Sequence, residues 1–539
     1  MDSNPAQIET RSDKNKSRPE TPPGWFRFLA PSTTDLIFII LLVAMTGGAL
    51  APRLLGDASI GWHIRNGEDM LRTHAITRTD SFSVTMNGQT WYAWEWLYDL
   101  VIAGAHHWLG LNGVVFFTAV IIALTFALTL RLSLQRGADL PTAGLLVALS
   151  LGTSMIHLFA RPHVLSWLFT VIWFQLLDRY DGEDSSEEDR RRVWHLPALM
   201  LLWVNVHGGW VVGFALLGLH LLSNAIQYFR GREAELWHRL RTLGRVTLIS
   251  GLASLVNPYG YQLHVHVYRY LSSRWLMNHI DEFHSPNFHG VAQQCFVAIL
   301  LIAVVALAVV RSKPSISRLL VLLFATYTGL YASRSLPVSS LLFTLIVAPI
   351  LTQGVTEAAS NPNLSPRVRA PLLRWQSFTA RVGRVELGFG GHLWPIAAVA
   401  LGLLLIAQPS QPGPPRWMDA QFDPRHMPAQ ASDLIVQRGI RDPIFAPDSW
   451  GGYLIYRLYP RNRVFVDDRH DLYGEVFLKD YLKAIRLTPD WDVFLKEKKV
   501  NWALLPAESS LANMLEETSQ WDVVYRDGTA VLLERKGKI

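Results

Sequence analysis

Long apolar stretches fill about half of residues 36–407 of this 539-residue chain. Eleven of them approach the length of a bilayer crossing, although several fall short of the roughly 20 residues that a perpendicular helix needs. We therefore expect an α-helical polytopic membrane protein with about 11 transmembrane helices, some of whose polar ends face protein or water. The segments are 36–55, 112–132, 141–160, 163–177, 196–206, 210–229, 246–256, 292–310, 319–333, 337–352 and 393–407.

The composition agrees with a membrane protein. Half of the residues are hydrophobic and 17% are charged, which excludes a water-soluble enzyme of ordinary composition. The net charge of +6 does not indicate a nucleic-acid partner, because the basic residues are not gathered on a soluble region. The single cysteine, Cys295, lies inside an apolar segment, so the chain is not a disulfide scaffold.

Positive charge is distributed unevenly between the two sets of connecting segments. With the N-terminus inside, the inner segments hold about three times as many Lys and Arg residues as the outer ones. This bias predicts a cytoplasmic N-terminus and an extracytoplasmic C-terminus. Residues 1–35 are polar, rich in Pro and Ser, and lack a signal-peptide core, so we expect a disordered cytoplasmic tail.

One stretch, residues 97–109, admits two interpretations because it is apolar but contains Asp99, His106 and His107. We interpret it as a half-buried helix that leads into the second span. A membrane crossing at this point would invert the orientation of everything that follows.

The chain changes character after residue 407. A Pro-rich joint, 408–415, opens the region 408–539, in which strand-like and helix-like runs alternate. This alternation is typical of a small soluble α/β domain, which the predicted orientation places outside the cytoplasm. The strand-like runs are 444–446, 463–467, 502–505, 521–525 and 530–534, and the helix-like runs are 477–486, 491–498 and 511–517.

The first outer loop, residues 56–111 of the transmembrane domain 36–407, carries the candidate catalytic residues Asp57, His63 and Glu95. Four tryptophans in the loop favour the headgroup level, where a carboxylate base can meet an amphiphilic substrate. The alternative is that Asp57 caps an interfacial helix over 58–71 and that the tryptophans are only anchors. The tryptophans are Trp62, Trp91, Trp94 and Trp96, and Asp80 lies among them.

Polar residues beside Pro or Gly occur at nearly every other outer helix end. Polar groups at one depth of a membrane protein are costly unless they are paired or functional, so together they predict a lined cavity. Each of these side chains, taken alone, could instead extend to the membrane–water interface or hydrogen bond to a neighbouring helix end. The candidates for binding a lipid phosphate or substrate are Arg161, His163, Asn205, His207, Glu282 and Arg334.

A metal site is a separate possibility. The outer loop 257–291 contains five histidines with Asp281 and Glu282, and carboxylates with imidazoles can hold a divalent ion. The spacing matches no ligand motif, so we assign no metal ligands and favour a structural interpretation. In the C-terminal domain, the runs 450–453 (Trp-Gly-Gly-Tyr) and 466–471 (Val-Asp-Asp-Arg-His-Asp) are dense in polar or small residues, and paired Asp could bind a sugar or cap a turn.

The plan of the chain resembles the GT-C membrane glycosyltransferases, particularly their bacterial protein mannosyltransferase-like and lipopolysaccharide sugar-transferase branch. An Asp that opens the first outer loop, interfacial helices, many spans and an outer C-terminal domain carry the resemblance, with residue-level support in 56–96. The adjacent Asp-Glu pair and the His-Pro-Pro motif of that pattern are absent, since this chain has Tyr92-Ala93-Trp94-Glu95-Trp96. The resemblance implies sugar transfer from a polyprenyl-phosphate carrier to an acceptor outside the cytoplasm, in a bacterial inner or plasma membrane.

This chemistry suits the residues. The leaving phosphate carries its own negative charge, so cations such as Arg161 and Arg334 would stabilise it and no acid need protonate it. The resemblance implies that Asp57 is the base that takes the acceptor proton, in a single displacement that inverts the anomeric centre. The partners would be the lipid-phosphate sugar, membrane lipid and an extracytoplasmic acceptor. The alternative is a non-enzymatic membrane protein, a transporter or a scaffold that presents the C-terminal domain.

Overall fold

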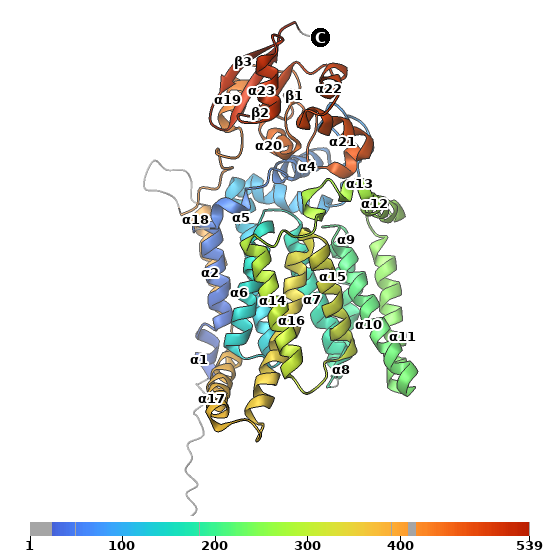
Figure 1. The fold of residues 1–539 in the computed structure, drawn as a ribbon, viewed down its shortest axis with the longest axis vertical. Helices are drawn as coiled ribbons and strands as arrows, with labels where there is room; N and C mark the ends of the chain where they lie inside the picture. The colour runs from blue at the N-terminus through green and yellow to red at the C-terminus, as the bar shows by residue number, and fades with distance from the viewer. Residues whose placement is uncertain (1–23, 49, 183, 390, 408–416, 538–539) are drawn as a thin grey trace, which may run out of the picture.

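A computed structural model describes residues 24–48, 50–182, 184–389, 391–407 and 417–537. A long helical bundle carries a small α/β domain at one end (Figure 1). Most of the predicted tail, residues 1–23, and the whole Pro-rich joint lie outside the described residues.

A helix covers at least part of each of the eleven predicted apolar segments. Among the described residues, six helical stretches are long and apolar enough to cross a membrane: 27–46, 96–135, 140–157, 210–231, 291–309 and 333–359. The helices of the bundle are α2 (Thr33–Thr46), α5 (Trp96–Gln135), α6 (Leu140–Ser154), α7 (His163–Asp181), α9 (Leu196–Val204), α10 (Trp210–Gly231), α11 (Ala234–Ser254), α14 (Val291–Val309), α15 (Ile316–Tyr331), α16 (Leu336–Ala359) and α18 (Leu393–Ile406).

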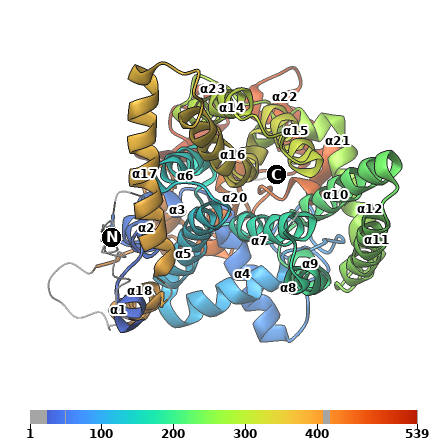
Figure 2. The ribbon, with the colours of Figure 1, turned by 90° about the horizontal axis from the view of Figure 1, so that it is seen from below.

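Three further helices lie at the end of the bundle opposite the C-terminal domain (Figure 1). They are α1 (Gly24–Leu29), α8 (Glu187–Arg192) and α17 (Pro366–Gly388). Seen from below, α17 lies along this end rather than through the bundle (Figure 2). Its sequence has Arg on several turns and an apolar stripe that includes the exposed Val368, Trp375, Phe378 and Val385.

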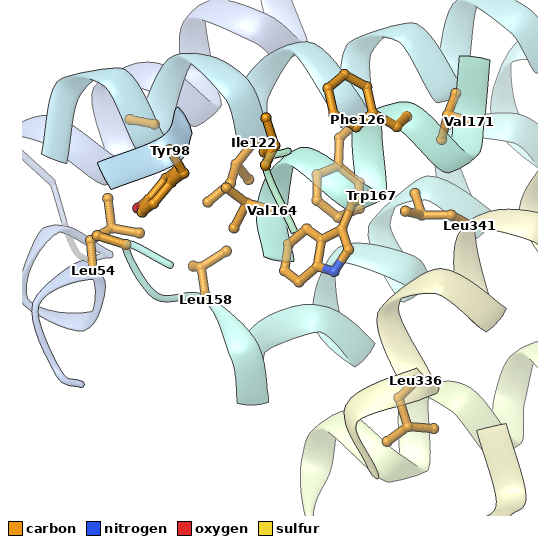
Figure 3. Packing of buried hydrophobic residues seen from close by; sticks show 14 of the residues in the cluster. Leu54, Tyr98, Ile122, Phe126, Leu158, Val164, Trp167, Val171, Leu336 and Leu341 are labelled. Carbon is orange, nitrogen blue, oxygen red and sulfur yellow. The ribbon is translucent and has the colours of Figure 1, made fainter. Parts of the chain in front are cut away.

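The centre of the bundle is an apolar layer between α5, α7 and α16, shown in Figure 3. Trp167 of α7 is almost fully buried and lies near Phe126 of α5. Small polar residues also join helices here, since the hydroxyls of Ser150 and Ser340 are 2.7 Å apart. Such contacts let helix backbones approach closely within a membrane-type bundle.

The helix that precedes the second span ends in a bend at Gly110. Its φ of +60° lies in the left-handed region that favours glycine, and it divides α5 into two helical parts. The first part runs across the end of the bundle nearest the C-terminal domain (Figure 1). The arrangement agrees with a half-buried helix that leads into a span.

The C-terminal domain, residues 417–537, has a four-stranded sheet in the order β1-β2-β4-β3. The strand β1 (Ile444–Phe445) is parallel to β2 (Trp502–Pro506), while β4 (Ala530–Arg535) is antiparallel to both β2 and β3 (Trp521–Arg526). The helices are α19 (Ala429–Gln437), α20 (Asp448–Leu458), α21 (His470–Arg486), α22 (Trp491–Glu497) and α23 (Ser510–Glu517).

The predicted strand over 463–467 is wrong. Only Val464 pairs, through single bridges to Ile444 on one side and Ser83 of the first loop on the other. The backbone cannot continue as a strand because Asp467 and Arg469 turn it inward around a buried ion pair. The helices α19 and α20 were not anticipated.

The first loop and the C-terminal domain form one packed unit. Helix α4 (Ile60–Thr73) lies directly under α20, and a Cβ atom on Gly61 would stand 2.2 Å from the carbonyl oxygen of Gly452. A Cβ on Gly452 would in turn stand 2.3 Å from the carbonyl oxygen of Ala58. These two glycines allow backbone-to-backbone contact between the domains.

Candidate functional site

Arg161 lies at the centre of a cluster of carboxylates from three distant segments. It stands in the turn before α7, and this turn is fixed by a hydrogen bond from the Ala160 N–H to the Leu54 carbonyl. Its Nη1 is 3.2 Å from Asp57 Oδ2 and 2.7 Å from Glu282 Oε1, and its Nη2 is 3.3 Å from Asp468 Oδ2. One guanidinium therefore joins the first loop, the loop before α14 and the C-terminal domain.

Asp57 does not cap α4, whose N-cap is Ser59, but it makes contacts both within the first loop and with the cluster. Its Oδ1 accepts hydrogen bonds from the backbone N–H of Ser59, at 2.8 Å, and from the Ser59 hydroxyl, so it orders the turn before α4. Its Oδ2 faces Arg161, and about a quarter of the side chain, 23%, remains exposed. The structural contacts use one oxygen and leave the other in the cluster.

Asp468 was not among the predicted site residues. Its Oδ1 accepts a hydrogen bond of 3.0 Å from the indole N–H of Trp62 in the first loop. Burial raises the pKa of Asp468 to about 7, and the neighbouring charges of Asp57 and Asp467 add to this increase against the opposing effect of Arg161. The C-terminal domain thus places a carboxyl that titrates near neutral pH beside Arg161.

Glu95 lies between two imidazoles, with Oε2 3.7 Å from His63 Nε2 and Oε1 3.7 Å from His207 Nε2. Burial and the nearby Asp99 raise the pKa of Glu95 well above its usual value. Burial, together with the charge of Arg161, lowers the pKa of His63, and burial with Arg334 does the same for His207. Burial therefore favours the neutral form of all three groups.

Both histidines also have a close partner at Nδ1. His63 Nδ1 lies 2.5 Å from Asp99 Oδ1, and its Nε2 faces Glu95. His207 Nδ1 accepts from the Gly209 N–H at 3.0 Å, so in the neutral ring its Nε2 carries the proton.

Glu282 and Arg334 stand on two neighbouring short helices, η3 (Asp281–Phe283) and η4 (Ser333–Ser335). Burial alone would raise the pKa of Glu282, but the charges of Arg161 and Arg334 outweigh it and hold the pKa well below its usual value. The Arg334 guanidinium lies 4.5 Å from the centre of the Phe283 ring. Within the described part of the chain it makes no hydrogen bond or ion pair, so its donors are free for an anion.

His163 and Asn205 belong to the framework around the cluster. His163 Nε2 donates to the His157 carbonyl at 2.8 Å, and its ring centre is 6.5 Å from that of His207. The Asn205 amide donates to the carbonyls of Leu201 and Val256, and its oxygen accepts from Trp96. Because these bonds occupy the Asn205 side chain, the geometry favours a role in joining α5 to α9 over a role in ligand binding.

Comparison with known proteins identifies the fold. No family model matches the chain, and no curated protein matches it. The structure of the Archaeoglobus fulgidus oligosaccharyltransferase in the apo form is similar over 88% of this chain and 69% of that chain, with 11% identity and a TM-score of 0.50. The chain has the GT-C fold.

Two other solved structures are similar to the chain. ArnT from Cupriavidus metallidurans bound to undecaprenyl phosphate matches over 94% of this chain and 97% of its own, with 15% identity and a TM-score of 0.49. The mycobacterial arabinofuranosyltransferase AftD matches over 93% of this chain and 41% of its own, with 12% identity and a TM-score of 0.48. The predicted GT-C resemblance is confirmed at the level of the fold, and the protein is an integral membrane protein.

The histidines of the loop 257–291 do not gather around one point of this GT-C fold. Among the described residues, no group of three or more His, Cys, Asp or Glu side chains is arranged to hold a metal ion. The histidines have separate partners instead: His264 contacts Ser254, His266 contacts Asp471, His279 stacks on Trp275, and His284 bonds to the Asn278 carbonyl.

Sequence reasoning therefore located one side of the candidate site in the GT-C fold and missed the other. Asp57, Arg161 and Glu282 are in contact, and Arg334 is close enough for its charge to act on Glu282 and Glu95. The missing part was the C-terminal domain. The density of charge in 466–471 was the only signal for it.

Proposed function

We propose that the protein is a membrane glycosyltransferase that moves a sugar from a polyprenyl-phosphate carrier to an acceptor outside the cytoplasm. The observation that carries the proposal is the contact of Arg161 with carboxylates from three segments, beside the unpaired guanidinium of Arg334. The GT-C fold supports this function and does not favour a transporter or a scaffold.

We propose further that all eleven apolar helices cross the membrane with the N-terminus in the cytoplasm. The bias of Lys and Arg supports this orientation. So does the position of α1, α8 and α17 at the end away from the C-terminal domain (Figure 1). The candidate site then opens at the outer face, where a lipid-linked donor and an extracytoplasmic acceptor can both reach it. The resemblance favours a bacterial inner or plasma membrane.

Arg334 is the proposed ligand of the donor phosphate. Its donors are uncommitted in the described residues, while Arg161 already faces three carboxylates. A guanidinium can bind phosphate through two parallel hydrogen bonds, which are about twice as strong as neutral ones. The aromatic ring of Phe283 supports the plane of the group. Arg161 would add its positive charge as the phosphate leaves.

Asp57 is the proposed base. The acceptor hydroxyl oxygen forms a bond to the anomeric carbon, the bond from that carbon to the phosphate oxygen breaks, and its electron pair remains on the phosphate. The hydroxyl proton passes to the carboxylate, which is typically worth a factor of 10² to 10⁴ in rate. A single displacement of this kind inverts the anomeric centre.

A donor-consumption assay tests the function. The purified protein is incubated with polyprenyl phosphates that carry different radiolabelled hexoses or pentoses, together with envelope material as a source of acceptor. We expect the label to leave one carrier and enter a water-soluble or polymeric product. Retention of the label on every carrier, with protein that remains folded, would overturn the proposal.

A further inference from the structure

The C-terminal domain reaches the candidate site through one short segment, Asp467–Asp471, and each residue of that segment has a defined contact. We propose that Asp468 is a second catalytic carboxylate, paired with Asp57 through Arg161, and that the acceptor proton comes to rest on it. The inference rests on the proposed glycosyl transfer. It makes the C-terminal domain a part of the active site rather than an appendage.

The segment is anchored on both sides of Asp468. Arg469 is 2% exposed and is held by Asp467 at 2.6 Å and by Asp80 of the first loop at 2.8 Å. Its guanidinium also lies 4.4 Å from the ring centre of Trp91. Asp471 accepts a hydrogen bond of 3.0 Å from His266, which stacks on Tyr92. These contacts join the C-terminal domain to the first loop and to α12 (Tyr261–Ser272).

The backbone on the other side of the segment is also fixed. Val464 and Ser83 form a parallel bridge, with hydrogen bonds of 2.9 Å from the Val84 N–H to the Val464 carbonyl and of 3.2 Å from the Val464 N–H to the Phe82 carbonyl. The hydroxyl of Thr85 donates to the Phe465 carbonyl. The first loop therefore extends the sheet of the C-terminal domain, and the position of Asp468 is set by backbone contacts on both sides.

The side chain of Asp468 is held in place but not enclosed. Trp62 fixes one oxygen and Arg161 the other, and 19% of the side chain remains exposed. Asp57 differs because one of its oxygens already receives two hydrogen bonds from Ser59. Asp57 and Asp468 both contact Arg161, and Asp468 is the one that accepts fewer hydrogen bonds.

The charged groups around Asp468 also act on its protonation. Asp57 and Asp467 favour its protonation, and Arg161 and His470 oppose it. Glu282 contacts Nη1 of Arg161, whereas Asp468 contacts Nη2. With a pKa of about 7, the carboxyl suits a general base at neutral pH, since the best catalytic pKa lies near the working pH. In the transfer step the acceptor loses its proton to the Asp57–Asp468 pair as its oxygen bonds to the anomeric carbon. The proton is then released to solvent from Asp468.

Steady-state kinetics of Asp468→Asn and Asp468→Glu test the inference. For the wild type we expect kcat to fall about tenfold per pH unit below pH 7, because Asp468 is then protonated before the reaction. Asp468→Asn should lower kcat by about 10²-fold at pH 7.5 with a smaller change in KM, and the remaining activity should decline only at lower pH. Asp468→Glu should restore part of kcat and the dependence on pH near neutrality.

The matched control is Asp480→Asn, which neutralises an exposed carboxylate of α21 that pairs with Lys483. It should leave kcat and its pH profile unchanged. Wild-type kinetics in Asp468→Asn, with the same pH profile, would overturn the inference and leave the proposed function intact. Equal loss in the Asn and Glu variants with an unshifted profile would also overturn it, because a structural role predicts that pattern. A wild type that consumes no donor would refute the proposed function and this inference together.

Discussion

Two charged clusters stand at opposite ends of the bundle and have inverse composition. At the end near the C-terminal domain, one arginine, Arg161, faces three carboxylates. At the other end one carboxylate, Asp178 of α7, faces Arg136 after α5 and Arg318 of α15. The same ion-pair chemistry serves both clusters, so composition alone does not separate them.

Exposure and the origin of the partners separate them. Asp178 and Arg136 are 5% and 8% exposed, Arg318 at the edge of the bundle is 33% exposed, and the cluster joins segments of three helices. The cluster of Arg161 is about one-fifth to one-third exposed and joins loops and a second domain. A buried pair between helices favours structure, whereas an accessible surplus of one charge favours chemistry.

The largest expected difference is in catalysis. Asp57→Asn should lower the rate of sugar transfer about 10²- to 10⁴-fold, because the amide cannot take the acceptor proton. The thermal unfolding midpoint should change little, since the amide oxygen still accepts hydrogen bonds from Ser59. Transfer assays and unfolding of the purified variant measure both effects. The exposed Asp281→Asn, beside Glu282, is the control, and a near wild-type rate in Asp57→Asn would exclude the base assignment.

The opposite cluster should show the reverse behaviour. Asp178→Asn leaves two guanidinium groups without their carboxylate, and breaking a buried pair in this way typically costs about 3–5 kcal/mol. We expect a lower unfolding midpoint but unchanged transfer activity per folded molecule. The exposed Asp184→Asn at the same end is the control. A specific loss of turnover in folded Asp178→Asn would remove the distinction between the two clusters.

Arg334 tests donor binding. Arg334→Gln removes the charge that we assign to the donor phosphate, and a hydrogen bond to a charged group is worth about 1.5–3 kcal/mol. The KM for the lipid-phosphate sugar should therefore rise about 10- to 100-fold. Arg274→Gln, at an exposed arginine of α13 (Arg274–Met277), should leave that KM unchanged. An unchanged KM in Arg334→Gln would assign the phosphate to another group.

The smallest effect on activity is expected at Glu95. Its raised pKa favours the neutral carboxyl, so the neutral amide of Glu95→Gln should change turnover only a few-fold. The raised pKa of Glu95 also defines the direction in which stability changes with pH. The unfolded carboxyl loses its proton near pH 4.5 while the folded one retains it, so wild-type stability falls as pH rises above that value. Unfolding midpoints from pH 5 to 8 should therefore fall more steeply for the wild type than for Glu95→Gln, and parallel curves would contradict a neutral Glu95.

The membrane part of the fold was predictable because its signals are local. Apolar segments of bilayer length predicted the positions of the helices, and a helix over 97–109 leads into the second span as expected, with an unpredicted bend at Gly110. The contact of Asp57 with Arg161 was predictable in part, since both residues lie at helix ends on the same side of the charge pattern. The depth of these two residues in the bundle had to be inferred. The GT-C resemblance supplied the proposed reaction.

The contribution of Asp468 could not be obtained in the same way. Its contact with Arg161 joins residues 307 positions apart, and it depends on how the C-terminal domain docks on the first loop. The periodicity of apolar residues in a sequence does not predict such a contact. The run 463–467 looked like an ordinary strand because its inward turn depends on Asp80, a partner from another domain. Asn205 looked like a ligand because a sequence does not show which polar groups are already hydrogen bonded.

The close approach of Gly61 and Gly452 bears on how chimaeric proteins of this architecture can be assembled. Helices α4 and α20 meet with no room for a methyl group on either glycine, so a larger residue at either position would force the two helices apart. Grafting residues 417–537 from a distant homologue would bring a foreign surface against the native α4. A working hybrid therefore needs the first loop and the C-terminal domain from the same parent protein. The two stretches have to be exchanged together although they are far apart in the sequence.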